Sequence, residues 1–208
     1  MDQNGLVNGL VGIYLAAGKS SRMGRAKLNL PVGNQYLGSM AFHAALESKL
    51  STIIVVTRKG ESLQWLTPFL NKKGWICLEC SQVDRGQSAS LKAGVRLAEE
   101  IGAAGVVVLL ADQPFVTSGM INRLVDDFQS SHNVSYISYS NNGILKPPAL
   151  FTRRLFHMLM KLTGDQGARA IIRGEMREQG KQIEIADDLP FLDIDTEEEY
   201  HFLLKKLQ

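Results

Sequence analysis

Short apolar runs alternate with amphipathic segments along most of this chain, and this alternation constrains the fold more than any other feature. Five runs rich in Val, Ile and Leu are typical of strands, at residues 11–15, 52–56, 75–78, 105–111 and 134–139. Helical patterns lie between and after them, most clearly at residues 36–48, 91–98, 121–128 and 196–207. Strands that are apolar on both faces and alternate with helices predict a mainly parallel sheet between two helical layers, a three-layer αβα architecture.

The helix near the C-terminal end has the most complete signature. Thr196 is its expected N-cap, and Glu199 three residues later completes a capping box. The apolar residues that then fall on one side of this helix are Tyr200, Leu203, Leu204 and Leu207. The helix over residues 121–128 has Thr117 as its expected cap.

Length and composition narrow the class of protein. A chain of 208 residues with 45% hydrophobic and 21% charged residues is typical of a globular protein, and we expect one domain over residues 1–208. The formal net charge of +2 is too small to predict a nucleic-acid or membrane partner. The first nine residues lack a signal-peptide pattern, and no run approaches the roughly 18 apolar residues of a membrane span, so we expect a cytoplasmic location.

Cys77 and Cys80 have no partner ligands for a zinc site, and we expect free thiols.

Unusual polar residues follow one expected strand after another. They lie at residues 18–27, at Asp112-Gln113 before Pro114, and at residues 141–148. Ligands of parallel sheets bind outside the carboxyl ends of the strands, where the strand order reverses. We therefore expect a ligand site that these segments build together.

The segment 15–27, LAAGKSSRMGRAK, matches neither standard nucleotide loop. A Walker A loop that includes Gly18-Lys19-Ser20 would need glycine at position 13, which is Ile13, and the Rossmann fingerprint lacks its third glycine. Small residues at 16 and 17 followed by several cations and hydroxyls favour a polyphosphate site, with a solvated basic turn as the alternative.

The order of these thirteen residues is more specific than their composition, and it resembles the nucleotide loop of the nucleotidyltransferases that attach a nucleotide to the molybdenum cofactor. Ala-Ala-Gly at residues 16–18 is similar to the cytidylyltransferase branch, because the guanylyltransferase branch typically has Ala-Gly-Gly there. Five further motifs extend the resemblance over nearly the whole chain: GQSASL at 86–91, ADQP at 111–114, PPALF at 147–151, GDQGAR at 164–169 and DIDT at 193–196. The resemblance implies a Rossmann-like nucleotidyltransferase fold.

Two aspartates are the expected metal ligands. The resemblance implies that Asp112 holds the metal and that Asp195 is the second acid. Asp193 is its neighbour, and the sequence leaves open which of the two is the second metal ligand. Mg²⁺ prefers one or two carboxylates plus substrate phosphate oxygens, and Mn²⁺ is the alternative ion. A turn or N-cap role is the other reading of Asp112, and attraction to a helix dipole is the other reading of Asp195.

The resemblance also implies a nucleotide site and a catalytic group. Arg22, Lys27 and Asp112 are the expected catalytic residues, the two cations stabilising the departing pyrophosphate. The expected nucleotide-binding residues are Leu15, Ala16, Ala17, Gly18, Ser20, Arg22, Gly24, Lys27, Gly86, Gln87, Ser88 and Ser90. From the residues themselves, a helix that begins after a tight turn explains the glycine and serines of 86–90 equally well.

The acceptor side is expected at two segments. From the residues themselves, Asp165 is expected to cap a helix over residues 166–172. The resemblance implies that Lys146, Pro147, Asp165 and Arg169 contact the pterin acceptor. Some relatives have Gly-His-Pro where this chain has Lys-Pro-Pro at 146–148.

The implied reaction joins CTP and the molybdenum cofactor into the cytosine dinucleotide form and releases pyrophosphate. Similarity to purine-catabolism accessory proteins implies a client enzyme of the xanthine dehydrogenase type. The acceptor phosphate is already an anion, so no general base is needed, and all four histidines lie outside the motifs. Three alternatives remain: another phosphate acceptor or GTP as donor, a non-catalytic carrier of finished cofactor, and an α/β domain without catalysis.

Overall fold

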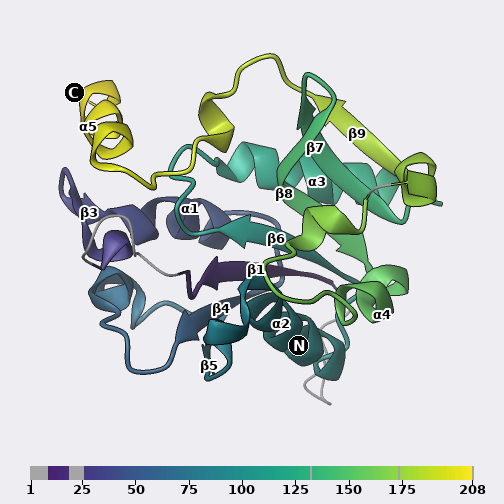
Figure 1. The fold of residues 1–208 in the computed structure, drawn as a ribbon, viewed down its shortest axis with the longest axis horizontal. Coiled ribbons are helices and arrows are strands. Elements are labelled where there is room, and N and C mark those ends of the chain that lie inside the picture. Colours follow the sequence, from purple (N-terminus) through teal and green to yellow (C-terminus); the bar gives the residue numbers. More distant parts are fainter. Residues whose placement is uncertain (1–8, 19–25, 132, 173, 208) are drawn as a thin grey trace.

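The computed structural model describes residues 9–18, 26–131, 133–172 and 174–207. In this part of the chain the main sheet has seven strands in the order β5-β4-β1-β6-β8-β7-β9 (Figure 1). Its strands are β1 Leu10–Ala16, β4 Thr52–Arg58, β5 Trp75–Cys80, β6 Gly105–Leu110, β7 Tyr136–Asn141, β8 Ile144–Thr152 and β9 Gly180–Glu184. A small antiparallel pair, β2 Pro31–Val32 and β3 Gln35–Tyr36, stands apart from it.

The sheet is mostly parallel and its strand order reverses beside β1. From β1 the chain first builds outward through β4 and β5, then returns to add β6 on the other side of β1. Strand β8 runs antiparallel to both β6 and β7, whereas β9 is parallel to β7. The reversal between β1 and β6 is the switch point at which ligands of such sheets bind.

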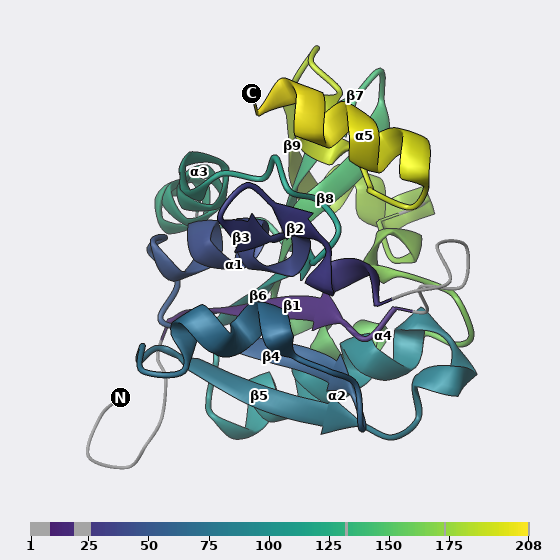
Figure 2. The same ribbon diagram turned by 90° about the vertical axis from the view of Figure 1, so that its left-hand side faces the viewer.

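Helices cover both faces of the sheet, as the alternation of the sequence predicts. Helices α1 and α3 lie on one face, and α2 and α4 lie on the other (Figure 2). Their bounds are α1 Leu37–Leu46, α2 Gln87–Glu100, α3 Ser118–Ser130, α4 Phe156–Leu159 and, near the C-terminal end, α5 Glu197–Lys206. Short 3₁₀ turns lie at Lys27–Asn29, Gln64–Phe69, Val83–Arg85, Arg153–Leu155, Ala168–Ala170, Gly174–Gln179 and Leu189–Phe191.

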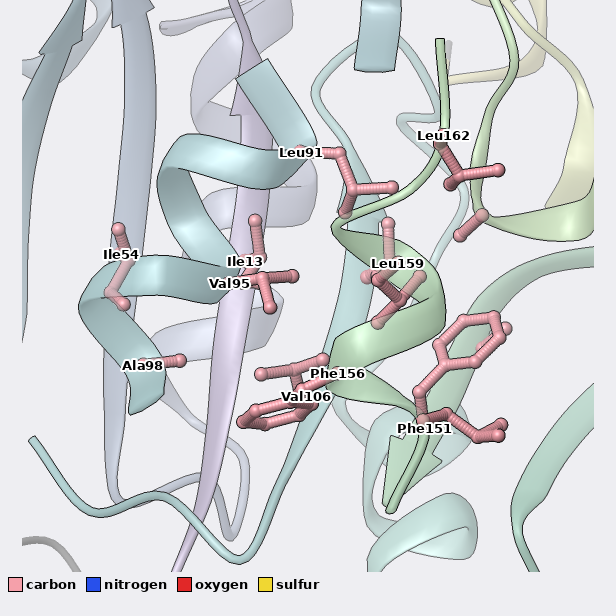
Figure 3. Close-up of a cluster of buried hydrophobic side chains, with 14 of the residues drawn as sticks. Ile13, Ile54, Leu91, Val95, Ala98, Val106, Phe151, Phe156, Leu159 and Leu162 are labelled. Carbon is pink, nitrogen blue, oxygen red and sulfur yellow. The ribbon is translucent and has the colours of Figure 1, made fainter. Parts of the chain in front are cut away.

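Strand β1 divides the core into two layers because its side chains alternate between the faces of the sheet. Val11 and Ile13 point toward α2, and Tyr14 points toward α1. Figure 3 shows the α2 layer, in which Val95 lies close to Ile13 and the same cluster includes Phe151 of β8 and Phe156 of α4. Most side chains of both layers are buried, so β1, at whose end the segment 15–27 begins, is held between them.

A third, smaller core joins the C-terminal segment to the residues that follow the nucleotide loop. Helix α5 begins at the predicted capping box, in which Thr196 accepts from the N–H of Glu199 and the Glu199 carboxylate accepts from the N–H of Thr196. The buried residues of this third core are Leu30, Val32, Leu37, Ile194, Tyr200 and Leu203. Both ribbon views place α5 next to the β2–β3 pair (Figures 1 and 2).

The five predicted strands are present, and Thr117 caps α3 as expected by accepting from the N–H of Met120. The sequence marks residues 141–148 only as a polar segment that follows the strand at 134–139, and in the structure most of that segment belongs to β8. The pairing of β8 with β7 passes from Ser138↔Ala149 to Tyr139↔Lys146, so the two prolines lie at the irregularity. Proline is tolerated there because no ladder hydrogen bond needs its missing N–H.

Two expectations from the sequence, which concern the cysteine pair and membrane-spanning segments, can be compared with the described residues. Cys77 and Cys80 are free thiols, the first exposed and the second buried in the core. None of the helices in the described ranges combines the length and apolar character needed to cross a membrane.

Candidate active site

A cavity of about 600 Å³ opens at the carboxyl ends of β1 and β6, at the switch point of the sheet. Its walls include residues 15–18 at the end of β1, residues 110–112 at the end of β6, and Asp193 and Asp195 from the segment before α5. Volumes of roughly 300–1,000 Å³ are typical of small-molecule sites. The polar segments that the sequence places after successive strands therefore share one cavity, with residues 141–148 as the exception.

Three charged side chains from distant parts of the sequence meet in this cavity. The Lys27 Nζ lies 2.8 Å from the Asp112 Oδ2 and 2.7 Å from the Asp195 Oδ1. Lys27 is 8% exposed, whereas the side chains of Asp112 and Asp195 are 27% and 40% exposed. The two carboxylates thus converge on one ammonium group at the edge of the cavity.

The charges alter each other's ionisation. Burial alone would lower the pKa of Lys27, but Asp112 and Asp195 outweigh it and raise the pKa above its ordinary value, so the ammonium stays charged. Burial and, after it, the neighbouring Asp112 raise the pKa of Asp193 to about 6, against the opposing hydrogen bond from Gln113. The cavity therefore holds a concentrated negative charge that favours a cation.

Backbone and side-chain hydrogen bonds fix the acidic segment against the end of β6. The N–H of Ile194 donates to the carbonyl of Asp112 at 2.9 Å. The buried Gln113 amide donates to the Asp193 Oδ1 at 2.9 Å, and the Glu199 carboxylate accepts from the N–H of Asp195 at 2.7 Å. The position of Asp195 relative to Asp112 is therefore built into the fold.

The segment 86–90, predicted to bind nucleotide, directs fewer backbone N–H groups toward the cavity than expected. The N–H of Gly86 donates to Val83 and that of Ser88 donates to the carbonyl of Gly164, so neither points freely into the cavity. Ser88 is buried and does not line the cavity, whereas Gly86, Gln87 and Ser90 do.

The residues expected to contact the acceptor fall into two groups. Asp165 and Arg169 line the cavity. The residues lining the cavity do not include Lys146 or Pro147, and the Lys146 Nζ instead lies 3.4 Å from Asp188.

The predicted helix over residues 166–172 is wrong. The structure has a single 3₁₀ turn, Ala168–Ala170, capped by Gly167 and not by Asp165. The physical reason is close packing of this segment against the start of α2: the N–H of Ser88 donates to the carbonyl of Gly164, and a Cβ at Gly86 would lie 2.3 Å from the Gly164 backbone.

Comparison with known proteins agrees with this geometry. The model of the MobA-like NTP transferase domain matches residues 12–183. The chain belongs to this family. The matched residues include Lys27 and Asp112, and they end before Asp195 and α5.

Individual relatives extend the likeness of this MobA-like chain. It is 38% identical over 205 residues to the purine catabolism protein PucB of Bacillus subtilis strain 168, covering 95% of this chain and 97% of PucB. The solved structure of Rv0371c from Mycobacterium tuberculosis H37Rv in complex with manganese is similar with a TM-score of 0.73 and 22% identity, covering 96% and 99% of the two chains. The 4-diphosphocytidyl-2C-methyl-D-erythritol synthase of Anaerococcus prevotii has a TM-score of 0.75 and 15% identity, with 99% and 97% covered. The two structural likenesses describe the fold alone.

The carboxylates of this family member suit a divalent ion that also binds substrate. In the described residues no group of three or more His, Cys, Asp or Glu side chains is arranged to hold a metal by itself. Asp112 and Asp195 nevertheless direct one oxygen each toward the same positive charge. Two carboxylates with further oxygens from a phosphate are the set that Mg²⁺ prefers, so the residues fit the ion.

Some expected residues lie outside the described ranges, and some cavity residues were not expected. Ser20, Arg22 and Gly24 belong to the first group. Leu28, Val83 and Asp84 line the cavity without having been predicted. Val83 and Asp84 come directly before the GQSASL motif, so extending that motif toward the preceding strand would have found them.

Gly86 provides a test of how the cavity wall is assembled. Its φ of 97° is unfavourable for other residues, and a Cβ there would lie 2.3 Å from the backbone of Gly164. We expect Gly86→Ala to lower the free energy of unfolding by about 2–3 kcal/mol, measured by urea denaturation. Gly60→Ala is the matched control, since Gly60 also has positive φ but no atom lies within 4 Å of its Cβ position. Equal losses in the two variants would contradict a role for close packing.

Proposed function

We propose that this nucleotidyltransferase transfers CMP from CTP to the molybdenum cofactor, forming the cytosine dinucleotide and pyrophosphate. The observation that carries the proposal is the convergence of Asp112, Asp195 and Lys27 at the edge of a cavity at the sheet's switch point. Such a site offers carboxylates for a divalent ion and a cation for a triphosphate within one enclosure.

The donor is proposed to lie along the end of β1. Ala16 and Ala17 are buried and line the cavity with Gly18, so a nucleotide can approach the backbone closely. Gln87 and Ser90 provide polar side chains on the α2 wall. The choice of CTP rests on the Ala-Ala-Gly sequence and on the similarity to PucB.

The divalent ion is proposed to be Mg²⁺ or Mn²⁺, held by Asp112 and Asp195. When bound, it supplies positive charge against the oxygens of the triphosphate. The manganese complex of the similar Rv0371c supports a divalent ion on this fold. Asp193, hydrogen-bonded to Gln113, adds negative charge behind the pair.

In the reaction, an oxygen of the acceptor's terminal phosphate attacks the α-phosphorus of CTP. A new P–O bond forms as the bond from the α-phosphorus to the bridging oxygen breaks, and pyrophosphate leaves with the electron pair. Lys27 stabilises the leaving pyrophosphate, with Arg22 proposed alongside it. Arg169, which lines the same cavity, orients the acceptor. No proton has to be removed from the attacking phosphate, so the site needs no general base.

The proposal includes a client enzyme of the xanthine dehydrogenase type. Its support is the 38% identity to a protein named for purine catabolism over almost the full length of both chains.

The deciding experiment incubates the protein with molybdenum cofactor, Mg²⁺ and each of the four nucleoside triphosphates, and follows pyrophosphate. We expect release with CTP to exceed that with GTP by at least about 10²-fold, the scale for a site that selects a base by its hydrogen bonds. Faster release with GTP would assign the protein to the other branch of the family.

Two controls distinguish the alternatives. Methylerythritol phosphate and a sugar phosphate replace the cofactor as acceptors, and rapid turnover with either would overturn the acceptor assignment. A carrier without catalysis would still activate its client in cells as the Asp112→Ala variant, whereas a transferase would lose that activity together with pyrophosphate release.

A further inference from the structure

The Lys27 ammonium lies where it satisfies both carboxylates of the proposed metal site. Its Nζ contacts the Asp112 Oδ2 at 2.8 Å and the Asp195 Oδ1 at 2.7 Å. These are single oxygens on two different segments, one at the end of β6 and one before α5. Lys27 is thus the shared counter-ion of both carboxylates.

A divalent ion and this ammonium compete for the same place. Both need the inward-facing oxygens of Asp112 and Asp195, and like charges in contact repel strongly in a partly buried site. The carboxylates themselves cannot be rearranged easily, because Ile194 is hydrogen-bonded to the backbone of Asp112 and Glu199 holds the N–H of Asp195. The group that can move is the flexible four-carbon stem of Lys27.

The cavity gives Lys27 a second anion to bind. Lys27 lines the same cavity as residues 15–18, so a triphosphate bound along the end of β1 would share that cavity with its ammonium group. Transfer of the ammonium to the phosphates would free the two carboxylates at the moment when phosphate oxygens arrive to complete a metal site.

We propose that Lys27 is an exchangeable counter-ion, which blocks the Asp112–Asp195 pair until a nucleotide draws it away and so makes strong metal binding depend on bound nucleotide. This inference rests on the proposed function, because it assigns the two aspartates to the divalent ion. By reciprocity, the metal strengthens nucleotide binding by the same factor.

The test measures Mn²⁺ binding to the nucleotide-free protein by calorimetry and by the electron paramagnetic resonance of free Mn²⁺. We expect Lys27→Met to bind Mn²⁺ at least about 10-fold more tightly than the unmodified chain, within the usual range of coupling between two ligands. Lys27→Gln, which keeps a hydrogen-bond donor without the charge, should show the same gain and guards against misfolding of the first variant. The gain should vanish when Asp112→Asn is added.

Arg169→Met is the matched control for general electrostatics. Arg169 lines the same cavity, and no ion pair to it is found among the described residues. We expect its removal to change Mn²⁺ affinity less than about 2-fold, since it does not contact the two carboxylates. An equal gain in Arg169→Met, or no gain in both Lys27 variants, would overturn the exchange.

Turnover separates this inference from the function on which it rests. If the unmodified chain releases pyrophosphate but the Lys27 variants bind Mn²⁺ no more tightly, the counter-ion role is wrong and the transferase function stands. If the Lys27 variants bind Mn²⁺ more tightly but the protein releases no pyrophosphate from any nucleotide, the transferase function is wrong and the competition at the aspartates stands.

Discussion

The Asp112→Asn variant is expected to release pyrophosphate about 10³-fold more slowly than the unmodified chain at saturating CTP, cofactor and Mg²⁺. The substitution keeps the shape of the side chain and removes only its charge, so the loss reports electrostatic stabilisation of the reacting phosphates. Asp112 follows β6 directly and contacts Lys27, so a neutral amide there weakens both the ion site and the placement of the ammonium. A continuous pyrophosphate assay measures the effect.

The matched control is Asp126→Asn. Asp126 also pairs with a lysine, Lys49 at 2.6 Å, but lies on the exposed side of α3 away from the cavity. We expect this variant to retain the turnover of the unmodified chain, and both variants to unfold at similar urea concentrations. Full activity of Asp112→Asn would remove Asp112 from the catalytic site.

The fold class could be predicted because the apolar strands are long and regular. Val and Ile runs such as Thr52–Arg58 are buried on both faces, and this pattern fits only a sheet covered by helices on both sides. Strands with weaker patterns were missed. Gly180–Glu184 is only partly buried and largely polar, and the β2–β3 pair has two residues per strand. Local sequence carries little signal for such pieces.

The site was predictable to the extent that topology determines it. Residues 16–18 and Asp112 follow neighbouring parallel strands, so their meeting at one end of the sheet follows from strand order. The contact of Lys27 with Asp195 spans 168 positions in the chain and depends on how the C-terminal segment returns to β6. No local spacing encodes that return.

The same reasoning explains why glycine-rich motifs were harder to interpret. The glycines of these motifs read as elements of a ligand loop and a helix start, yet Gly86 and Gly164 bring two backbone segments into direct contact, and Gly167 lies against the side chain of Gln87. That contact builds the wall of the cavity that carries Asp165 and Arg169. A motif can thus be required for the site without each of its residues touching a ligand.

The third core links the two sides of the proposed metal site, and this predicts a large effect of Leu203→Ala. Leu203 is fully buried against the residues that follow Lys27, so its truncation should lower the free energy of unfolding by about 3–4 kcal/mol, measured by urea denaturation. Because the same core contains Ile194, we also expect weaker Mn²⁺ binding in the presence of CTP. Leu207→Ala is the control, since Leu207 is 51% exposed and should change the unfolding free energy by less than about 0.5 kcal/mol. If Leu203→Ala behaved like Leu207→Ala, the packing of α5 would contribute little to the free energy of unfolding, and the position of Asp195 would depend on its hydrogen bonds alone.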